Sequence, residues 1–112
     1  MEAYLRSREI ERIRRITNLV VRGDKEAVDA ELAEPVGAGF WQALASYSNH
    51  FTELPSTFET ELKAYRFDRS SGMIAEVPLW EDSTGPSDVH LSFLVELLGD
   101  IPRITITNLR IP

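Results

Sequence analysis

The sequence predicts an α+β domain in which three N-terminal helices pack on one face of a curved, four-stranded antiparallel β-meander. Two observations carry this prediction. Apolar residues recur every three or four positions up to about residue 50, and every second position from residue 57 onwards. Clusters of glycine, proline, serine and aspartate separate these segments. With 112 residues, 43% of them hydrophobic, the chain suits one domain spanning residues 1–112.

The first helix is predicted over residues 2–22, where an aliphatic stripe faces one side. Gly23 follows the last periodic residue and suits the left-handed conformation that ends many helices. Asp24 is a favourable N-cap for a second helix over residues 25–34. Arg22-Gly23-Asp24 is therefore predicted to be a joint between helices and not an adhesion motif. The stripe consists of Ile10, Ile13, Ile16, Leu19 and Val20.

A third helix is predicted over residues 39–50, and four strands follow it. Pro78 lacks an N–H group, so its strand should lie at an edge or be kinked there. A change of phase near Asn108 predicts a β-bulge. Residues 81–87 form the most polar loop, and Gly99-Asp100 fits a hairpin turn. The strands are expected at residues 57–67, 73–80, 88–98 and 101–111.

The net charge of −6 is unevenly distributed. Residues 1–25 carry seven basic and four acidic groups, whereas the remaining 87 residues carry five basic and fourteen acidic groups. An acidic body disfavours nucleic acid and favours a basic protein partner. No cysteine is present, and neither a secretory signal nor a run of about 18 apolar residues occurs, so we expect a cytoplasmic protein without membrane association.

The segment Leu-Val-Val-Arg-Gly-Asp-Lys-Glu-Ala-Val at residues 19–28, and the ending Ile-Thr-Asn-Leu-Arg-Ile at residues 106–111, resemble the cystatin-like or NTF2-like group of small α+β domains. Residues 20–24 resemble the helix joint of that group. The resemblance implies a polar pocket between helices and sheet, which Trp41, Tyr47, Tyr65 or His90 would line. No position matches a catalytic motif of the family.

The candidate chemistry in the sequence is sparse. Asp88 and His90 lie two residues apart on one strand face, which suits an oriented general base, although a plain surface pair is the simpler interpretation. Glu59, Glu61 and Glu76 are predicted as neighbouring carboxylates on adjacent strands, either a cation site or a solvated face. We therefore predict no catalytic residue, no cofactor and no metal site.

These observations favour a protein-binding module over an enzyme. The most specific form of this hypothesis is an immunity or antitoxin-like inhibitor that covers the cationic active site of a basic, nuclease-type toxin. The alternative is an NTF2-like small-ligand-binding protein or enzyme with a pocket under the sheet, and self-association into a homodimer is a third hypothesis. The predicted partner-binding residues are Glu59, Glu61, Glu76, Trp80, Glu81, Asp82 and Asp88.

Overall fold

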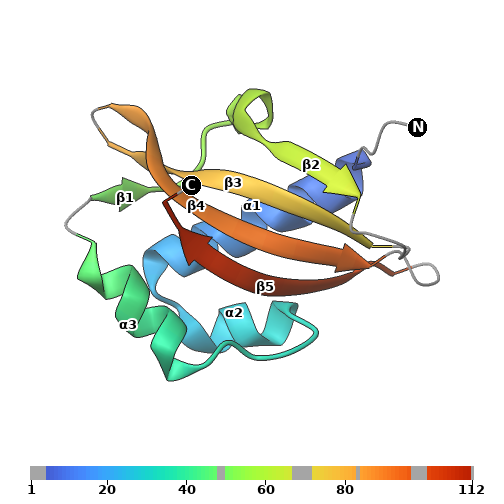
Figure 1. Cartoon of the computed structure of the whole chain (residues 1–112), viewed down its shortest axis with the longest axis horizontal. Helices are drawn as coiled ribbons and strands as arrows, with labels where there is room; N and C mark the ends of the chain where they lie inside the picture. The colour runs from blue at the N-terminus through green and yellow to red at the C-terminus, as the bar shows by residue number, and fades with distance from the viewer. Residues whose placement is uncertain (1–4, 48–49, 67–71, 83, 97–100, 112) are drawn as a thin grey trace.

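The computed structural model describes residues 5–47, 50–66, 72–82, 84–96 and 101–111 of the chain. Within these residues it contains three α-helices and a five-stranded antiparallel sheet, which confirms the α+β class (Figure 1). The helices are α1 (Ser7–Arg22), α2 (Lys25–Glu31) and α3 (Ala38–Ser46), with a short 3-10 helix η1 (Phe58–Glu61). The strands are β1 (Phe51–Thr52), β2 (Lys63–Arg66), β3 (Gly72–Glu81), β4 (Gly85–Glu96) and β5 (Arg103–Arg110).

The sheet has one strand more than the four that were predicted. The strands β2, β3, β4 and β5 pair antiparallel in chain order, and the additional strand β1 pairs with the same edge of β3 as β2 does. The strand β2 lies beside the first half of β3, and β1 lies beside its end at Trp80 and Glu81. A two-residue strand such as β1 has too few positions to show a period, so the sequence pattern could not reveal it.

The joint between α1 and α2 has the predicted form. Gly23 adopts the left-handed conformation with φ of 74°, and the Asp24 amide donates a hydrogen bond to the Leu19 carbonyl at 3.2 Å. The Asp24 carboxylate accepts a hydrogen bond from the Ala27 amide at 3.3 Å, as an N-cap does. Arg-Gly-Asp is therefore explained by helix capping.

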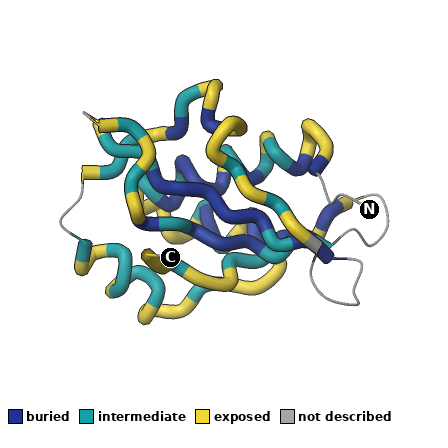
Figure 2. The backbone as a smooth tube through the Cα atoms, turned by 45° about the horizontal axis from the view of Figure 1, so that its top comes forward, coloured by how far each residue is buried: buried dark blue, intermediate teal, exposed yellow. Residues whose placement is uncertain are grey.

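The helix α1 packs against one face of the sheet, and no described helix covers the opposite, outer face (Figure 1). The space between α1 and the sheet is filled with apolar side chains, and Figure 2 shows the buried backbone running along the central strands. The fully buried members include Ile13, Ile16 and Val20 from α1, Val28 from α2, Ala75, Val77 and Leu79 from β3, Leu91, Phe93 and Val95 from β4, and Ile104 from β5.

The prediction of a strand over residues 57–67 is wrong in its first half. Residues 58–61 form η1, and within the described part of this range the strand covers residues 63–66. Phe58 is 2% exposed and anchors this turn, whereas Thr60, which the two-residue period placed on the same buried face, is exposed. Phe58 and Leu62 are four residues apart, so the spacing also suits a helical turn, and tertiary packing of Phe58 decides between the two.

Two irregularities of the sheet were predicted. The pairing of β4 with β5 shifts by one residue between Ser92 with Asn108 and Phe93 with Ile106, which places a bulge at Thr107. The pairing of β3 with β4 is irregular directly after Pro78, at the position where neither β1 nor β2 pairs with β3. A proline without an amide donor is tolerated at such a gap.

Further boundaries differ from expectation, and the helix α2 ends at Glu31 and not at residue 34. The helix α3 ends at Ser46 and not at residue 50, and His50 is exposed outside it. The predicted loop 81–87 is shorter, because β3 continues through Glu81 and β4 begins at Gly85. The turn predicted at Gly99-Asp100 lies outside the described residues.

Candidate protein-binding surface

The predicted partner residue Glu76 lies on the outer face of the sheet, on the central strand β3. Its neighbours in register on β2 and β4 are Lys63 and Ser92. The carboxylate is nearly buried, and its Oε1 accepts hydrogen bonds from Arg110 at 2.9 Å and from the Ser92 hydroxyl at 3.4 Å. The hydrogen bond to Glu76 and the charge of that carboxylate raise the pKa of Arg110. Glu76 thus links β3, β4 and β5, and its charge is already compensated within the chain.

Three of the other predicted acids, Glu59, Glu61 and Asp82, lie toward the edge of the sheet formed by β1 and β2, whereas Asp88 lies on the inner strand β4. Glu59 and Glu61 are exposed on η1, which leads into β2. Asp82 is exposed in the β3–β4 hairpin, and its amide donates to the His50 carbonyl at 3.4 Å. Asp88 is exposed on the outer face of β4. Figure 1 shows η1 and the hairpin projecting on this side of the sheet.

A contrast in charge pairing separates this region from the helical side of the molecule. Elsewhere in the described chain, most carboxylates have an arginine partner: Glu9 with Arg6 and Arg8, Glu11 with Arg14, Glu31 with Arg15, Glu53 with Arg22, Glu34 and Glu96 with Arg103, and Glu76 with Arg110. Asp24 and Asp29 accept backbone hydrogen bonds, and Glu81 accepts one from Thr84.

The carboxylates of Glu59, Glu61, Asp82 and Asp88 have no ion pair or hydrogen bond among the described residues, a property they share only with Glu26 of α2. We call these four residues the acidic edge. Because they are solvated and uncompensated, they offer negative potential to a partner, whereas the paired carboxylates of the helical side do not.

Trp80 lies close in the chain to Asp82, a member of the acidic edge. It is half-buried at the end of β3, pairs in register with Thr52 of β1 and Pro86 of β4, and its indole nitrogen lies 3.7 Å from the point where a Cβ would stand on Gly85. Gly85 has φ of 86°, so the hairpin turns where only glycine is unstrained. Trp80 is therefore fixed beside Glu81 and Asp82 with part of its ring exposed.

The structure does not place the residues of the implied pocket beneath α1. Trp41 lies on α3, where its ring packs edge-on against Phe40 at 5.2 Å and the Lys25 ammonium lies 5.7 Å from its centre. Tyr65 is 46% exposed on the outer side of β2, and Tyr47 caps the end of α3.

His90 lies on the outer face of β4, opposite Pro78 and Arg110. Its Nδ1 atom is buried and has no hydrogen-bond partner among the described residues, so no bond from Asp88 orients the ring. The arrangement required of an Asp-His general base is thus not formed.

A hollow lies elsewhere, between α3 and the edge strand β5. It is an open groove of about 330 Å³, bordered by Val36, Phe40 and Ala43 on one side and by Ile106 and Leu109 on the other. No group of three or more histidine or acidic side chains suited to a metal ion occurs within the described part of the chain.

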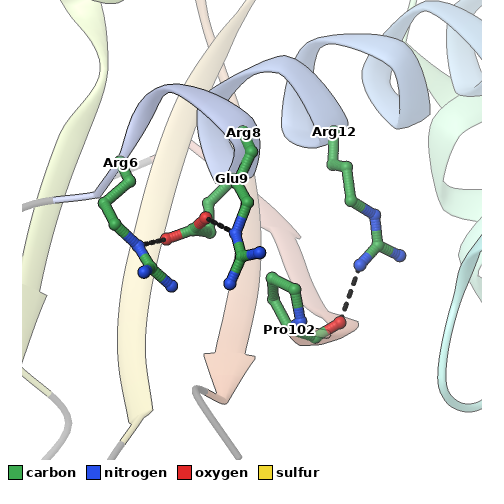
Figure 3. Close-up of polar contacts among 5 residues, drawn as sticks. All are labelled: Arg6, Arg8, Glu9, Arg12 and Pro102. Atoms are coloured by element: carbon green, nitrogen blue, oxygen red, sulfur yellow. Dashed lines mark hydrogen bonds and ion pairs between the residues drawn. The ribbon is translucent and has the colours of Figure 1, made fainter. Parts of the chain in front are cut away.

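The sequence pattern did not reveal a second polar cluster, on α1. Arg6 and Arg8 both donate to Glu9, whose side chain is 1% exposed, and Arg12 donates to the Pro102 carbonyl at 2.7 Å (Figure 3). A signal was present, since Glu9 falls four residues before Ile13 on the buried stripe of the helix. A carboxylate at a core position requires partners, and the flanking arginines provide them.

None of the helices in the described ranges is long and apolar enough to cross a bilayer. Comparison of the chain with protein-family models, curated proteins and solved structures finds no match.

Proposed function

We propose that this chain is a small acidic protein-binding module that docks onto a basic partner protein through the acidic edge and Trp80. In its most specific form, it is an immunity or antitoxin-like inhibitor that covers the cationic active site of a nuclease-type toxin. One observation carries the proposal: the four carboxylates of the acidic edge have no ion pair or hydrogen bond among the described residues, whereas every glutamate of α1, α2 and the loop after α2 except Glu26 has an arginine partner.

Electrostatic complementarity of this kind speeds association and selects against partners of the same sign. Tryptophan is enriched among the residues that dominate binding energy, and such residues are surrounded by contacts that exclude water. The partly exposed ring of Trp80 beside Glu81 and Asp82 has this arrangement. We therefore expect Trp80 to control the dissociation rate and the acidic edge to control the association rate.

The alternative of a ligand pocket under the sheet has less support. The interior between α1 and the sheet is filled by side chains that are fully buried, among them Ile16, Leu91 and Phe93. The groove between α3 and β5 is open and lies outside this layer, so it differs from the pocket that the NTF2-like resemblance implies.

The test compares two variants of equal net charge. The first neutralises the acidic edge by Glu59→Gln, Glu61→Gln, Asp82→Asn and Asp88→Asn. The second neutralises four acids of the helical side and its neighbouring loops by Glu11→Gln, Glu26→Gln, Glu34→Gln and Glu53→Gln. The probe is whichever basic product of a neighbouring gene this chain retains in a low-salt pull-down. The association rate is measured by stopped flow at low and high salt, together with the nuclease activity of that product.

We expect the edge variant to lower the association rate about tenfold at low salt and to relieve inhibition of the nuclease, while the control variant stays within about twofold of the wild type. Equal effects of the two variants would show that only net charge matters. Failure of any basic neighbouring product to bind at low salt would refute the proposal.

A further inference from the structure

Glu9 is the most deeply buried carboxylate of the described chain. It lies in the first turns of α1 on the stripe that faces the sheet, and its side chain is 1% exposed. Each of its two oxygens accepts one hydrogen bond: Oε1 from Arg6 Nε and Oε2 from Arg8 Nε, both at 3.0 Å. One carboxylate therefore fixes two guanidinium groups, one on each side of it.

The hydrogen bonds to Glu9 leave much of each guanidinium group unused. They involve only Nε, so the terminal nitrogens of Arg6 and Arg8 have no partner among the described residues, and the two side chains are 56% and 50% exposed. Figure 3 shows the two guanidinium groups flanking the carboxylate, with the terminal nitrogens of both directed away from α1. Two donor groups are thus held side by side and open to solvent.

The local charge is positive although the molecule is acidic. Glu9 compensates one of the two arginines, and the nearby Arg12 adds a further positive charge, because its guanidinium donates to the neutral carbonyls of Pro102 and Glu31 at 2.7 and 3.0 Å. Two charges of this sign suit a dianion. Two adjacent guanidinium groups also match the several oxygens of a tetrahedral anion better than the two oxygens of a carboxylate.

We propose that Arg6 and Arg8, positioned by the buried Glu9, form a binding site for a small phosphate-type oxyanion. The acidic body disfavours a polyanion such as nucleic acid, so the ligand is a free phosphate or a small phosphate monoester. Arg6 and Arg8 contact the ligand, whereas Glu9 acts through them as a positioning residue. The inference is independent of the acidic edge, and its failure would leave the proposed function untouched.

The positioning role makes an unusual prediction for Glu9→Gln. This change raises the net charge by one and would strengthen a merely electrostatic attraction for an anion. If Glu9 holds the two arginines together against their mutual repulsion, its loss lets them separate, and phosphate binds more weakly despite the added positive charge. The sign of the change therefore separates a built site from diffuse attraction.

The experiment is a titration of the ¹⁵N-labelled full chain with inorganic phosphate at constant ionic strength, followed through the arginine Nε–H signals by NMR. We expect saturable shifts of the Arg6 and Arg8 signals. The dissociation constant should rise about tenfold or more in Arg6→Ala, Arg8→Ala and Glu9→Gln. Arg14→Ala removes an equal charge from the same helix and should stay within about twofold of the wild type.

Each contrary result overturns the proposal. Tighter phosphate binding by Glu9→Gln, or equal weakening by Arg14→Ala, would show diffuse attraction only. If acetate bound as tightly as phosphate, Arg6 and Arg8 would form a site for carboxylates and not for phosphate. If the shifts did not saturate with increasing phosphate, there would be no binding site. Backbone spectra of each variant establish that it is folded. If Glu9→Gln does not fold, the comparison of Arg6→Ala and Arg8→Ala with Arg14→Ala decides between a specific site and diffuse attraction.

Discussion

Two buried carboxylates, Glu9 and Glu76, show how single residues tie this chain together. Burial raises the pKa of Glu9, but the hydrogen bonds from Arg6 and Arg8 and the charge of Arg6 outweigh it and hold the pKa below its ordinary value of 4.5. Because the pKa is lowered in the folded state, Glu9 contributes stability above about pH 4.5. This contribution disappears as the pH falls through the folded-state value.

Glu9→Gln is accordingly expected to lower the free energy of unfolding by about 1–2 kcal/mol at pH 7, because charge-assisted hydrogen bonds are lost. At pH 3, below the ordinary pKa of 4.5, unfolding is favoured by proton uptake at Glu9, so the difference between variant and wild type should shrink. Urea denaturation at both pH values measures this, with Glu26→Gln as a control because Glu26 has no described partner. A difference that stayed constant between pH 7 and pH 3 would contradict the assignment.

For single residues, the sequence predicted the face on which a side chain lies better than it predicted the interaction partner of that side chain. The two-residue period placed Glu76 on the polar face of its strand, and the structure agrees. Its partner Arg110 is 34 residues away and reaches it only through the pairing of β3 with β4 and of β4 with β5, including the bulge at Thr107. Such a long-range ion pair follows from strand register, which a local pattern does not specify.

Elements whose ends depend on local chemistry were predicted well. The joint of α1 and α2 depends on one glycine and one aspartate, and the bulge of β5 follows from a change of phase inside a single strand. The first half of the strand over residues 57–67 was predicted wrongly, because Phe58 satisfies both a strand and a helical turn and the choice depends on what it packs against. The brief strand β1 exists only because β3 offers it an edge.

Two glycine-to-alanine substitutions with opposite expected effects on stability test whether local chemistry determines these elements. Gly23 has φ of 74° and open space where a Cβ would stand, so Gly23→Ala meets only the backbone penalty of the left-handed conformation, about 1 kcal/mol of destabilisation. Gly39 also faces open space but lies within α3, where alanine should stabilise by about 0.5–1 kcal/mol. Thermal denaturation of the two variants measures both values, and destabilisation by Gly39→Ala would show that α3 needs this glycine for another reason.

For the molecule as a whole, the filled interior decides which functions are open to it. A domain with a hollow beneath its sheet binds its ligand there, whereas a domain with a complete core must use its surface. Here the described surface carries a basic cluster at the start of α1 and, separately, the acidic edge. The sequence predicted this asymmetry from composition, but only the structure shows which of the acids lack partners.

A larger side chain at a buried position distinguishes a filled interior beneath the sheet from a hollow one. Ala75 is fully buried on the core face of β3, opposite Phe93 in register, with Ile106 beyond it on β5. If this layer is filled, Ala75→Leu forces side chains out of their preferred rotamers and destabilises the domain by about 1–3 kcal/mol. In a hollow, the added methyl groups would instead gain burial and stabilise the domain.

The control is Ala30→Leu on the exposed side of α2, which adds the same atoms outside the core and should change stability by less than about 0.5 kcal/mol. Urea denaturation compares the three proteins, and an Ala75→Leu variant at least as stable as the wild type would restore the pocket hypothesis and weaken the case for a surface-binding module.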